Sequence, residues 1–433
     1  MEDSIWTKTA EMPTFPSLEG DVKTDVLIIG GGIAGLLCAY KLQEAGVDYM
    51  LVEAGRVCGG VTKDTTAKIT SQHGFIYHKI LRRFGREKAR GYYEANQAAL
   101  EEYRRLAQTI DCDFEEKSSY VYVKNKPSEI EKELAALTKL SVPADYVKDL
   151  PLPFSTMGAI RFERQAQFHP LKFLAALCKD LHIYENTKVK ELLPGVAVTD
   201  KGKITAKKIV VATHFPFINK HGAYFLKMYQ HRSYVLALEN APNFSGMYVD
   251  AQEKGMSFRR YGKYLFIGGG DHRTGEKGGC WQELSAFAEK HYPQAKVVAK
   301  WATQDCITLD DMPYIGLYAR STPDFYVTTG FNKWGMTSAM VGANLLADKI
   351  LGRKNAYAEI FSPSRTILRS RFFSHVGKTV LNMLTPTVPR CPHLGCALKY
   401  NKQEHSWDCP CHGSRFTEDK KLLDNPATGD MKK

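Results

Sequence analysis

The sequence lacks any apolar run long enough to cross a membrane. The longest uncharged stretch among its 433 residues, positions 26–40, is broken by four glycines, whereas a membrane-spanning helix needs about 20 predominantly apolar residues. The start of the chain is acidic and no apolar stretch follows it, so a secretory signal is not expected. Internal repeats and low-complexity segments are missing as well. We therefore expect a globular protein without a membrane span.

The chain also lacks a block of lysines and arginines, although basic residues outnumber acidic ones by 59 to 47 and the formal net charge is +12. Basic tails that bind nucleic acid carry such a block, so we expect no nucleic-acid partner. A dispersed positive charge is typical of a solvated surface. It would also attract an acidic protein partner.

Cysteines are unevenly placed. Six of the ten are scattered, and the remaining four crowd near the C-terminus. The scattered ones are Cys38, Cys58, Cys112, Cys178, Cys280 and Cys306. Isolated cysteines in a long chain are typical of a reducing compartment rather than of a secreted disulfide scaffold, so we expect a cytoplasmic protein.

A strand–turn–helix–strand pattern opens the chain. Residues 25–29 form a short apolar run rich in β-branched side chains, which predicts a buried parallel strand. A glycine-rich turn and a helical pattern follow, and residues 49–52 predict a second strand. Together these segments make one βαβ unit.

Further elements alternate along the chain. Helices are predicted over residues 79–107, 128–140 and 337–351, and strands over residues 120–124, 204–212, 234–239, 264–269 and 325–329. At roughly 100–200 residues per domain, this alternation predicts an α/β nucleotide-binding domain with a second, sheet-rich domain inserted into it.

Residues 365–384 are basic and carry a stripe of apolar side chains. The stripe consists of Ile367, Leu368, Phe372, Phe373, Val376, Val380 and Leu381. Such a helix either lies on a membrane surface or packs on its own protein, and we favour packing. The proline-rich stretch 385–389 then predicts a break before a C-terminal module.

The glycine-rich turn has the spacing of a dinucleotide-binding site. Gly30, Gly32 and Gly35 lie between the first strand and the helix, and Glu53 ends the second strand. Glycines at this spacing allow a tight turn, a close approach of the backbone to a pyrophosphate, and close packing of the helix on the sheet. The helix N-terminus offers free N–H groups, and the Glu53 carboxylate can accept hydrogen bonds from a ribose.

Several segments resemble FAD-dependent oxidoreductases of the D-amino-acid oxidase, glycine oxidase and sarcosine oxidase family. The resemblance covers about residues 20–355 and is carried by residues 56–60, 186–189, 210–213 and 330–337. An alternative for the last segment is a plain glycine-rich turn. The resemblance implies that the cofactor FAD contacts Gly30, Gly32, Gly35, Glu53, Gly60, Thr66, Val189, Ala212, Gly330, Trp334, Gly335, Met336 and Thr337.

The same resemblance suggests residues for a small-molecule substrate. Thr66 and Lys68 fall in the region that wraps the flavin, where a lysine can donate to flavin N5 or to a water. Other segments that resemble pocket-lining ones contain His73, Arg232, Tyr234, Arg259 and Arg260. An arginine with a tyrosine is the usual clamp for an amino-acid carboxylate, but this sequence does not clearly match that pair. The candidate catalytic residues are Lys68, His73, Tyr234 and Arg260, with a surface lysine and a sheet-surface arginine as alternatives.

The C-terminal cysteines lie in two short motifs with metal-ligand spacing. A C-x-H motif at residues 391–393 is followed, after fifteen residues, by C-x-x-H at residues 409–412. Two thiolates on one iron and two imidazoles on the other make a Rieske [2Fe–2S] centre, whereas zinc would use the same atoms. Gly395, Gly413 and Ser414 favour iron–sulfur, because cluster-binding loops need a close backbone approach and N–H donors. The predicted metal ligands are Cys391, His393, Cys409 and His412.

Cys396 and Cys411 are left over, one in each loop. The pair resembles that of Rieske proteins of the cytochrome bc type, which implies a disulfide between the loops. Ser414 matches a serine that hydrogen-bonds a cluster sulfide in those proteins, and residues 425–429 resemble their proline loop. Only a short proline-rich segment precedes Cys391, so we expect an abbreviated module whose cluster is steadied by packing on the flavoprotein.

These interpretations divide the chain into three parts with the fold class α/β + β. The first is a Rossmann-like FAD-binding domain, and the second is an inserted mixed α+β substrate domain. The third is a small C-terminal Rieske-type iron–sulfur module. The predicted bounds are 1–85, 161–215 and 301–360 for the FAD-binding domain, 86–160 and 216–300 for the substrate domain, 361–388 for a linker, and 389–433 for the abbreviated Rieske domain.

Two redox centres in one chain predict an oxidoreductase. The expected substrate is an amine or amino-acid-like compound that gives a hydride to FAD. Electrons then leave one at a time through the [2Fe–2S] cluster to an external electron acceptor or donor protein, for which an acidic surface would suit the positive charge.

Three alternatives stay open. The first is an electron-transfer or redox-sensing protein without its own organic substrate. The second is a zinc-stabilised flavoprotein. The third, a Rieske oxygenase, needs a further iron site of two histidines and a carboxylate, and its catalytic domain is absent from this pattern.

Overall fold

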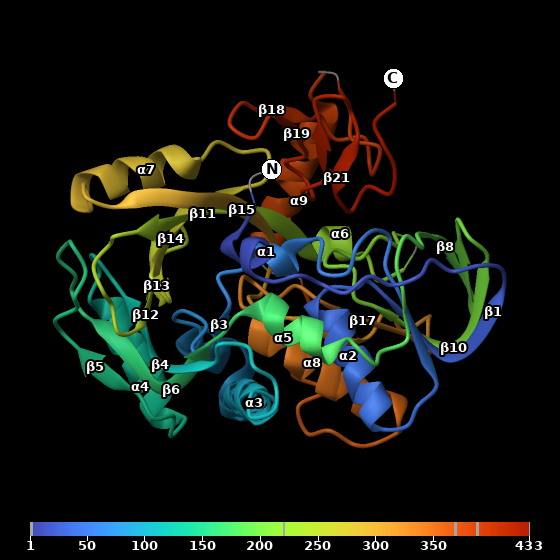
Figure 1. Ribbon diagram of the computed structural model, residues 1–433, viewed down its shortest axis with the longest axis horizontal. Helices are drawn as coiled ribbons and strands as arrows, with labels where there is room; N and C mark the ends of the chain where they lie inside the picture. Colours follow the sequence, from blue (N-terminus) through green and yellow to red (C-terminus); the bar gives the residue numbers. More distant parts are fainter. Residues whose placement is uncertain (1–2, 220, 368–369, 387–388, 433) are drawn as a thin grey trace.

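The computed structural model describes residues 3–219, 221–367, 370–386 and 389–432. Figure 1 shows two large sheets side by side, with the small C-terminal module above them. Among the described residues, no helix is both long and apolar enough to span a bilayer.

The first sheet has eight strands and a parallel centre. The order along it is β16-β17-β10-β1-β2-β7, and β8 and β9 extend β10 in antiparallel fashion. The apolar residues 26–29 of β1 are almost fully buried, as a central parallel strand covered on both faces requires. The strands are β1 (Val22–Ile29), β2 (Tyr49–Val52), β7 (Ile183–Tyr184), β8 (Val189–Leu193), β9 (Val196–Thr199), β10 (Lys203–Val211), β16 (Tyr314–Leu317) and β17 (Phe325–Thr329).

Helices α2 (Ile33–Glu44) and α8 (Gly335–Ile350) pack against each other and against this sheet. Helix α5 (Pro170–Leu177) contacts α2. Both α2 and α8 follow directly on glycine-containing turns at the carboxyl ends of parallel strands. Their N-termini therefore lie at the edge of the sheet where nucleotides bind in such folds.

The second sheet has nine strands in the order β15-β11-β14-β13-β12-β4-β6-β3, with β5 beside β6. Its pairs are antiparallel except for β12 with β4. The strands are β3 (Lys68–Ile69), β4 (Glu115–Tyr122), β5 (Asp145–Val147), β6 (Ala159–Gln167), β11 (Met228–Glu239), β12 (Met247–Asp250), β13 (Ser257–Tyr261), β14 (Tyr264–Arg273) and β15 (Lys296–Thr308).

Three helices accompany the second sheet. Helix α7 (Cys280–His291) packs on β14 and β11, and α3 (Tyr77–Leu106) packs on α4 (Ser128–Lys139) and on α8. Gly85, with φ of 86°, bends α3, since a left-handed residue cannot continue a right-handed helix. The short helical segments are α1 (Ile5–Thr9), η1 (Val61–Asp64) and α6 (Tyr224–Lys227).

The C-terminal module, residues 389–432, is built on four short antiparallel strands. They are β18 (Lys399–Asn401), β19 (Ser406–Asp408), β20 (Arg415–Thr417) and β21 (Leu422–Asp424). Its core contains the four C-terminal cysteines with Leu398, Phe416, Ala427 and Met431. A core this small explains why the module leans on the rest of the molecule.

Helix α9 (Ser370–Leu384) connects the large sheets to the module, and its packing corrects part of the sequence-based expectation. His375 and Thr379 are buried, but Phe373 is 66% exposed and Leu381 is 69% exposed. The buried positions of α9 are thus polar, and the expected packing of the apolar stripe on the protein is wrong for Phe373, Val380 and Leu381, which are exposed. Leu368 of the stripe and residues 387–388 of the proline-rich break lie outside the described residues.

The predicted helices and strands correspond to elements of the structure, and the fold class is confirmed. Three of the predicted domain bounds, 85/86, 160/161 and 300/301, fall inside α3, β6 and β15. Both strands belong to the second sheet. The sheet that a strand joins is decided by hydrogen-bonding partners far away in the sequence, which the local sequence does not reveal.

Candidate functional site

The turn between β1 and α2 has no room for side chains. A Cβ on Gly35 would lie 1.9 Å from the carbonyl oxygen of Gly30, so only glycine lets α2 pack this close to the strand. Gly30 has φ of 112°, and a Cβ there would lie 2.6 Å from the carbonyl oxygen of Ala212. The result is a cradle of bare backbone at a helix N-terminus, which suits a pyrophosphate.

Glu53 ends β2 beside this cradle. Its carboxylate accepts hydrogen bonds from the N–H groups of Gly31 at 2.7 Å and Gly55 at 2.9 Å. Sequence reasoning missed a second acid, Glu185, which is fully buried and accepts from the Val57 N–H at 2.7 Å. Glu185 also pairs with Arg56, so it fixes the loop after Glu53. A lone glutamate after a short strand gives no sequence signal for such a role.

A single large cavity of about 1070 Å³ joins the cradle to the second sheet; we call it the central cavity. Among the predicted FAD contacts, those that line it are Gly30, Gly32, Glu53, Gly60, Thr66, Val189, Ala212, Gly330, Trp334, Gly335 and Met336. Gly35 and Thr337 lie just behind the wall, the first in the helix packing and the second in a hydrogen bond with His73. Segments distant in sequence thus meet around one space that fits a dinucleotide.

His73 holds the wall of the cavity together. Its Nε2 lies 2.8 Å from the carbonyl oxygen of Thr70, so Nε2 carries the proton and Nδ1 accepts from the Tyr92 hydroxyl at 2.7 Å. Its ring stacks on Trp334 with centroids 5.0 Å apart. Burial lowers the pKa of His73 to about 3. A neutral ring with both nitrogens engaged acts as a positioning group rather than as a proton carrier.

Lys68 on β3 faces the cavity. Its Nζ donates to Thr66 Oγ1 at 3.0 Å. Burial, followed by the nearby Arg259 guanidinium, lowers the pKa of Lys68 to about 7. The Arg259 side chain itself lies behind the wall, where it donates to the carbonyl oxygens of Thr66 and Ala67. Lys68 is thus an amine that can hold or release a proton near neutral pH.

Two of the candidate catalytic residues point elsewhere. Arg260 is directed away from the cavity, and its guanidinium donates to the carbonyl oxygens of Ala241, Pro242 and Lys263. The sheet-surface alternative therefore describes Arg260 better than a pocket role. Tyr234 lines the cavity, but its hydroxyl donates to Glu404 of the C-terminal module at 2.8 Å. Successive side chains of a strand point to opposite faces of the sheet, and the sequence alone does not show which face each of them takes.

The four predicted metal ligands meet in the C-terminal module. The rings of His393 and His412 lie 5.1 Å apart at 85°, and Cys391 and Cys409 are buried without a disulfide. Both histidines have a buried Nδ1 without a hydrogen-bond partner among the described residues. His393 Nε2 lies 2.9 Å from Asn219 Oδ1, an acceptor that fixes the proton on Nε2 and leaves Nδ1 free for a metal.

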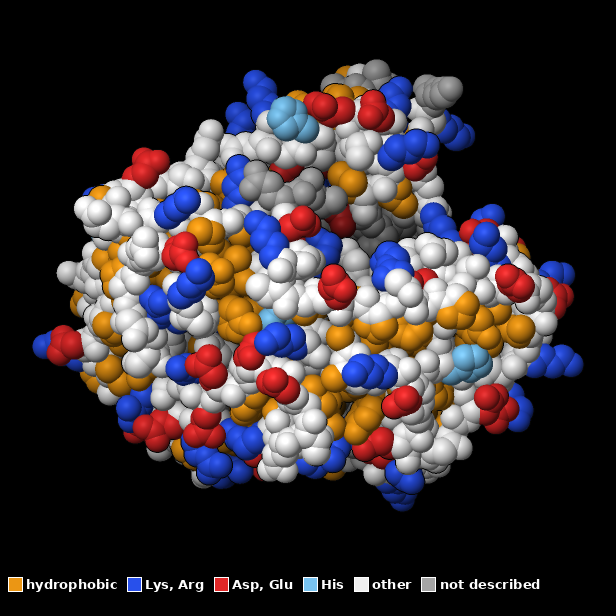
Figure 2. Space-filling view, viewed as in Figure 1, with side chains coloured by type: hydrophobic (Ala, Val, Ile, Leu, Met, Phe, Trp, Pro, Cys, Tyr) orange, Lys and Arg blue, Asp and Glu red, His pale blue; other side chains and the backbone are white. Residues whose placement is uncertain are grey.

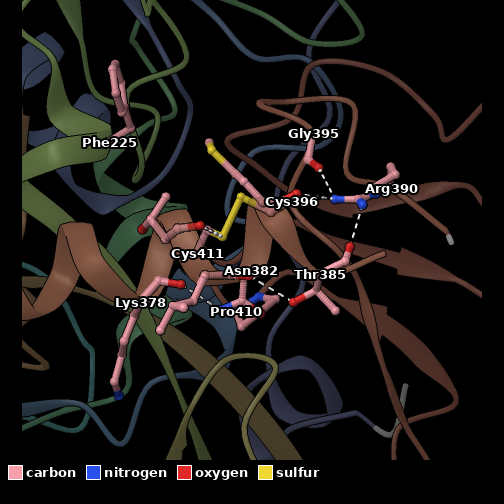
Figure 3. Close-up of a disulfide and its surroundings, with 12 residues drawn as sticks. Phe225, Lys378, Asn382, Thr385, Arg390, Gly395, Cys396, Pro410 and Cys411 are labelled. Atoms are coloured by element: carbon pink, nitrogen blue, oxygen red, sulfur yellow. Dashed lines mark hydrogen bonds between the residues drawn. A yellow bond between two sulfur atoms is a disulfide. The ribbon is translucent and has the colours of Figure 1, made fainter. Parts of the chain in front are cut away.

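Burial also prepares these histidines for metal binding. It lowers the pKa of His393 to about 4 and that of His412 well below its usual value, so both rings are neutral. Neutral imidazoles with orphaned Nδ1 atoms beside two unbonded thiols are the donor set of a Rieske [2Fe–2S] cluster. Figure 3 shows the disulfide between Cys396 and Cys411, which ties the two ligand loops together beside α9.

The module is docked on the second sheet by side chains that no sequence motif marks. Gln230 Nε2 on β11 donates to the carbonyl oxygens of His412 at 3.0 Å and Asn425 at 2.7 Å. Gln304 Nε2 on β15 donates to the carbonyl oxygen of Gly413 at 2.8 Å. A Cβ on Gly413 would lie 2.4 Å from Gln230 Cβ, so the ligand loop presses directly on the strand.

An ion-pair network adds to this contact. Arg232 on β11 pairs with Glu404, and Arg415 of the module pairs with the same carboxylate at 2.8 Å. All three side chains are at most 4% exposed. Arg273 on β14 donates to the carbonyl oxygens of Pro410 at 3.0 Å and Cys411 at 2.9 Å. Side chains of the three adjacent strands β15, β11 and β14 thus bind the backbone of the second ligand loop, residues 409–413.

Known proteins share both parts of this chain. The family model for FAD dependent oxidoreductases matches residues 25–349, and that for the Rieske [2Fe-2S] domain matches residues 377–433. The Rieske 2Fe-2S iron-sulfur protein YhfW of Bacillus subtilis (strain 168) is 33% identical, over 99% of this chain and 97% of that protein. Gamma-glutamylputrescine oxidoreductase of Escherichia coli (strain K12) is 23% identical, over 80% of this chain and 88% of that protein.

A solved structure agrees with these matches at the level of the fold. The crystal structure of glycine oxidase from Geobacillus kaustophilus superposes with a TM-score of 0.65 at 20% identity. The match covers 80% of this chain and 99% of that one. This chain therefore shares the fold of that structure over the matched part.

Proposed function

We propose, from the premise that the chain belongs to the FAD dependent oxidoreductase family and ends in a Rieske [2Fe–2S] domain, that it is an amine dehydrogenase. In this proposal the electrons taken from the amine pass from the flavin through the cluster to an external acceptor. The docking of the C-terminal module on the wall of the central cavity carries the proposal.

One β-strand separates the two cofactor sites. On β11, Tyr229 and His231 line the central cavity, while Gln230 between them donates to the carbonyl oxygen of the cluster ligand His412. Alternate residues of a strand point to opposite faces. The cluster site therefore lies directly behind the cavity wall, which favours transfer within the chain over release of electrons to oxygen.

The residues present fit both groups. The bare cradle at Gly30 and Gly35, with Glu53 beside it, would hold the FAD pyrophosphate and ribose. When bound, FAD supplies hydride acceptance and single-electron release. Lys68 would hold a proton at the cavity surface, and His73 would keep the loop at Trp334 in place. The C-terminal cluster supplies one-electron transfer at a raised potential, because two of its ligands are neutral histidines.

An amine suits the cavity better than an amino-acid carboxylate. The arginines that line it are engaged elsewhere within the described structure: Arg56 with Glu185, Arg273 with Pro410 and Cys411, and Arg371 with Asp311. None of these is left to clamp a carboxylate. The name of the relative gamma-glutamylputrescine oxidoreductase is in keeping with an amine substrate.

His393 marks the exit for electrons in this proposal. His412 is fully buried, whereas His393 is half-buried, with its Nε2 against Asn219. An acidic redox protein would suit the net charge of +12. Figure 2 shows basic and acidic side chains interspersed on the face drawn, so the attraction would come from the summed charge rather than from one patch on that face. We also propose a cytoplasmic location, in keeping with six buried unpaired cysteines outside the module.

The test compares two electron acceptors with purified holoprotein. With an amine substrate we expect rapid turnover with ferricyanide, a one-electron acceptor, and slow turnover with oxygen. Cys391→Ser should abolish the turnover with ferricyanide while leaving anaerobic bleaching of the flavin intact. Fast oxygen-dependent turnover that Cys391→Ser leaves unchanged would refute the proposal.

A further inference from the structure

Four polar side chains on the second sheet face the central cavity in two cross-strand pairs. His231 on β11 pairs with Asp305 on β15, and Ser233 pairs with Thr303. All four line the cavity. Side chains of directly paired residues share one face, with Cβ atoms about 5 Å apart. We call this group the polar ladder.

Each residue of the polar ladder has a polar atom without a hydrogen-bond partner within the described structure. His231 is 3% exposed, yet its Nδ1 has no hydrogen-bond partner, and neither has the buried hydroxyl of Ser233 or Thr303. The Asp305 carboxylate has neither a hydrogen bond nor an ion pair among the described residues. Buried polar groups in folded proteins are paired with protein, water or a ligand, so three such atoms beside the half-buried carboxylate of Asp305, itself unpaired among the described residues, indicate a ligand site.

Asp305 also stands out among the acids of the cavity. Every other described carboxylate that lines it has a partner: Glu53 with Gly31 and Gly55, Asp250 with Gln252, Glu253 with His231, Asp271 with Lys333, Glu276 with Lys378, Asp311 with Arg83 and Arg371, and Asp424 with Arg415. Asp305 therefore contributes one negative charge to the cavity that no ion pair neutralises.

His231 and Asp305 offer acceptors only, and the hydroxyls of Ser233 and Thr303 can accept as well as donate. His231 Nε2 lies 3.2 Å from Glu253 Oε1, so Nε2 donates and Nδ1 remains a bare acceptor. Burial lowers the pKa of His231 against the opposing effect of Glu253, which keeps the ring neutral. A carboxylate also only accepts. The matching ligand group is an ammonium, with three N–H donors and a positive charge.

We propose that the polar ladder binds the ammonium group of a cationic amine substrate, with Asp305 as its counter-ion. Asp305 precedes Cys306, whose carbonyl oxygen accepts from the N–H of Asn332 at 3.1 Å. Asn332 belongs to the loop 330–337 that lines the cavity beside Trp334. The ladder therefore sits next to the proposed flavin loop and favours amines while repelling carboxylates. This inference rests on the proposed function for its location beside FAD.

The test uses three probes of the same shape that cannot react. tert-Butylammonium, pivalate and tert-butanol are cationic, anionic and neutral, and none has a hydrogen on a carbon beside nitrogen. Each is titrated into the FAD-loaded protein while the flavin absorbance is followed. We expect tert-butylammonium to perturb the spectrum saturably and the other two to bind at least about tenfold more weakly.

Asp305→Asn keeps the shape of the side chain and removes its charge. We expect it to weaken tert-butylammonium binding about tenfold or more, with unchanged FAD content. Glu276→Gln, which removes a cavity-rim charge that Lys378 already neutralises, should stay within about twofold of wild type. Pivalate binding as tightly as tert-butylammonium, no probe binding at all, or unaltered binding by Asp305→Asn would each overturn the proposal. The proposal would also be overturned if Asp305→Asn lost its FAD instead of losing only the binding of tert-butylammonium.

The outcomes separate this inference from the proposed function. If amines bleach the flavin equally fast in wild type and Asp305→Asn, the dehydrogenase proposal survives and the ladder fails as the ammonium site. If tert-butylammonium binds through Asp305 but no amine bleaches the flavin, the ladder stands and the dehydrogenase proposal fails.

Discussion

Asp305 shows how a single residue can carry function at the expense of stability. Burial raises the pKa of its carboxyl to about 6. Because the folded-state value lies above that of the unfolded chain, ionising Asp305 favours unfolding, and its contribution to stability is lost as pH rises through 6. Functional sites often retain such uncompensated groups.

Asp305→Asn should therefore stabilise the free protein. We expect a gain on the order of 1 kcal/mol in the free energy of unfolding at pH 7.5, shrinking steadily between pH 6 and 4 as the wild-type carboxyl becomes protonated. Urea unfolding of wild type, Asp305→Asn and the control Glu276→Gln across this range measures it. A variant less stable than wild type at pH 7.5 would mean that Asp305 has a stabilising partner.

Gly35→Ala tests the cradle. The added Cβ would lie 1.9 Å from the carbonyl oxygen of Gly30, so α2 must move off the strand and distort the phosphate site. We expect purified Gly35→Ala to have lost most of its FAD while it keeps the visible absorbance of the cluster. Gly377→Ala on α9, where nothing lies within 4 Å of the new Cβ, is the control and should keep both. Full FAD occupancy in Gly35→Ala would contradict the account.

At the scale of elements, the junction between β11 and the module includes one carboxylate, Glu404, that two arginines share. Burial alone would raise the pKa of Glu404, but the charges of Arg232 and Arg415 lower it to about 2. A pKa below its unfolded value contributes stability that is present above about pH 4.5 and lost as pH falls towards 2. Docking of the module should therefore weaken in acid.

Glu404→Gln should loosen the module while the cradle at Gly30 and Glu53 stays intact. It leaves two arginines that are 3% and 2% exposed without this partner, at a cost of about 3 kcal/mol. We expect faster hydrogen exchange in β18–β21 and slower reduction of the cluster, with an unchanged rate of flavin bleaching. Glu418→Gln, which removes an exposed pair with His405, should do neither. Slower flavin bleaching in Glu404→Gln would place Glu404 in the substrate site instead.

The disulfide between Cys396 and Cys411 should slow the loss of the cluster from the protein without affecting the binding of FAD. It closes a loop of 15 residues between the ligand motifs, worth about 3 kcal/mol in a chain-entropy account. We expect the Cys396→Ser/Cys411→Ser double variant to lose its cluster to an iron chelator at least several-fold faster than wild type, with unchanged FAD content. Equal loss rates, followed by the decay of cluster absorbance, would contradict this role.

What the sequence could predict follows from how local each signal is. The cradle and the metal ligands are spaced within short segments, so Gly30, Gly35, Cys391 and His412 could be identified directly. The direction of a strand residue depends instead on partners far away in the chain. For that reason the sequence leaves both a pocket role and a sheet-surface role open for Arg260, and it carries no signal for Asp305.

The same limit applies to contacts between elements. Gln230 and Gln304 dock the module through backbone carbonyls, and glutamine in a strand has no motif. The exposed side of α9 was likewise not foreseen, because an amphipathic pattern gives the period of a helix but not how much of its apolar face is covered.

At the scale of the whole molecule, the second sheet serves as a shared wall. One face of β11 and β15 lines the central cavity and the other supports the cluster module. Figure 1 shows the module seated above these two strands, away from α3 and α4. In the proposed function, this arrangement would join substrate oxidation to one-electron export within a single chain.

Rapid mixing of the anaerobic holoprotein with an amine that bleaches its flavin tests whether electrons pass from flavin to cluster within one molecule. Flavin absorbance and the electron paramagnetic resonance signal of the reduced cluster are followed over the same single turnover. The account predicts that the flavin is reduced first, and that the cluster signal then rises at a rate independent of protein concentration. A cluster that stays oxidised while the flavin remains fully reduced, or that is reduced only through collisions between molecules, would contradict it.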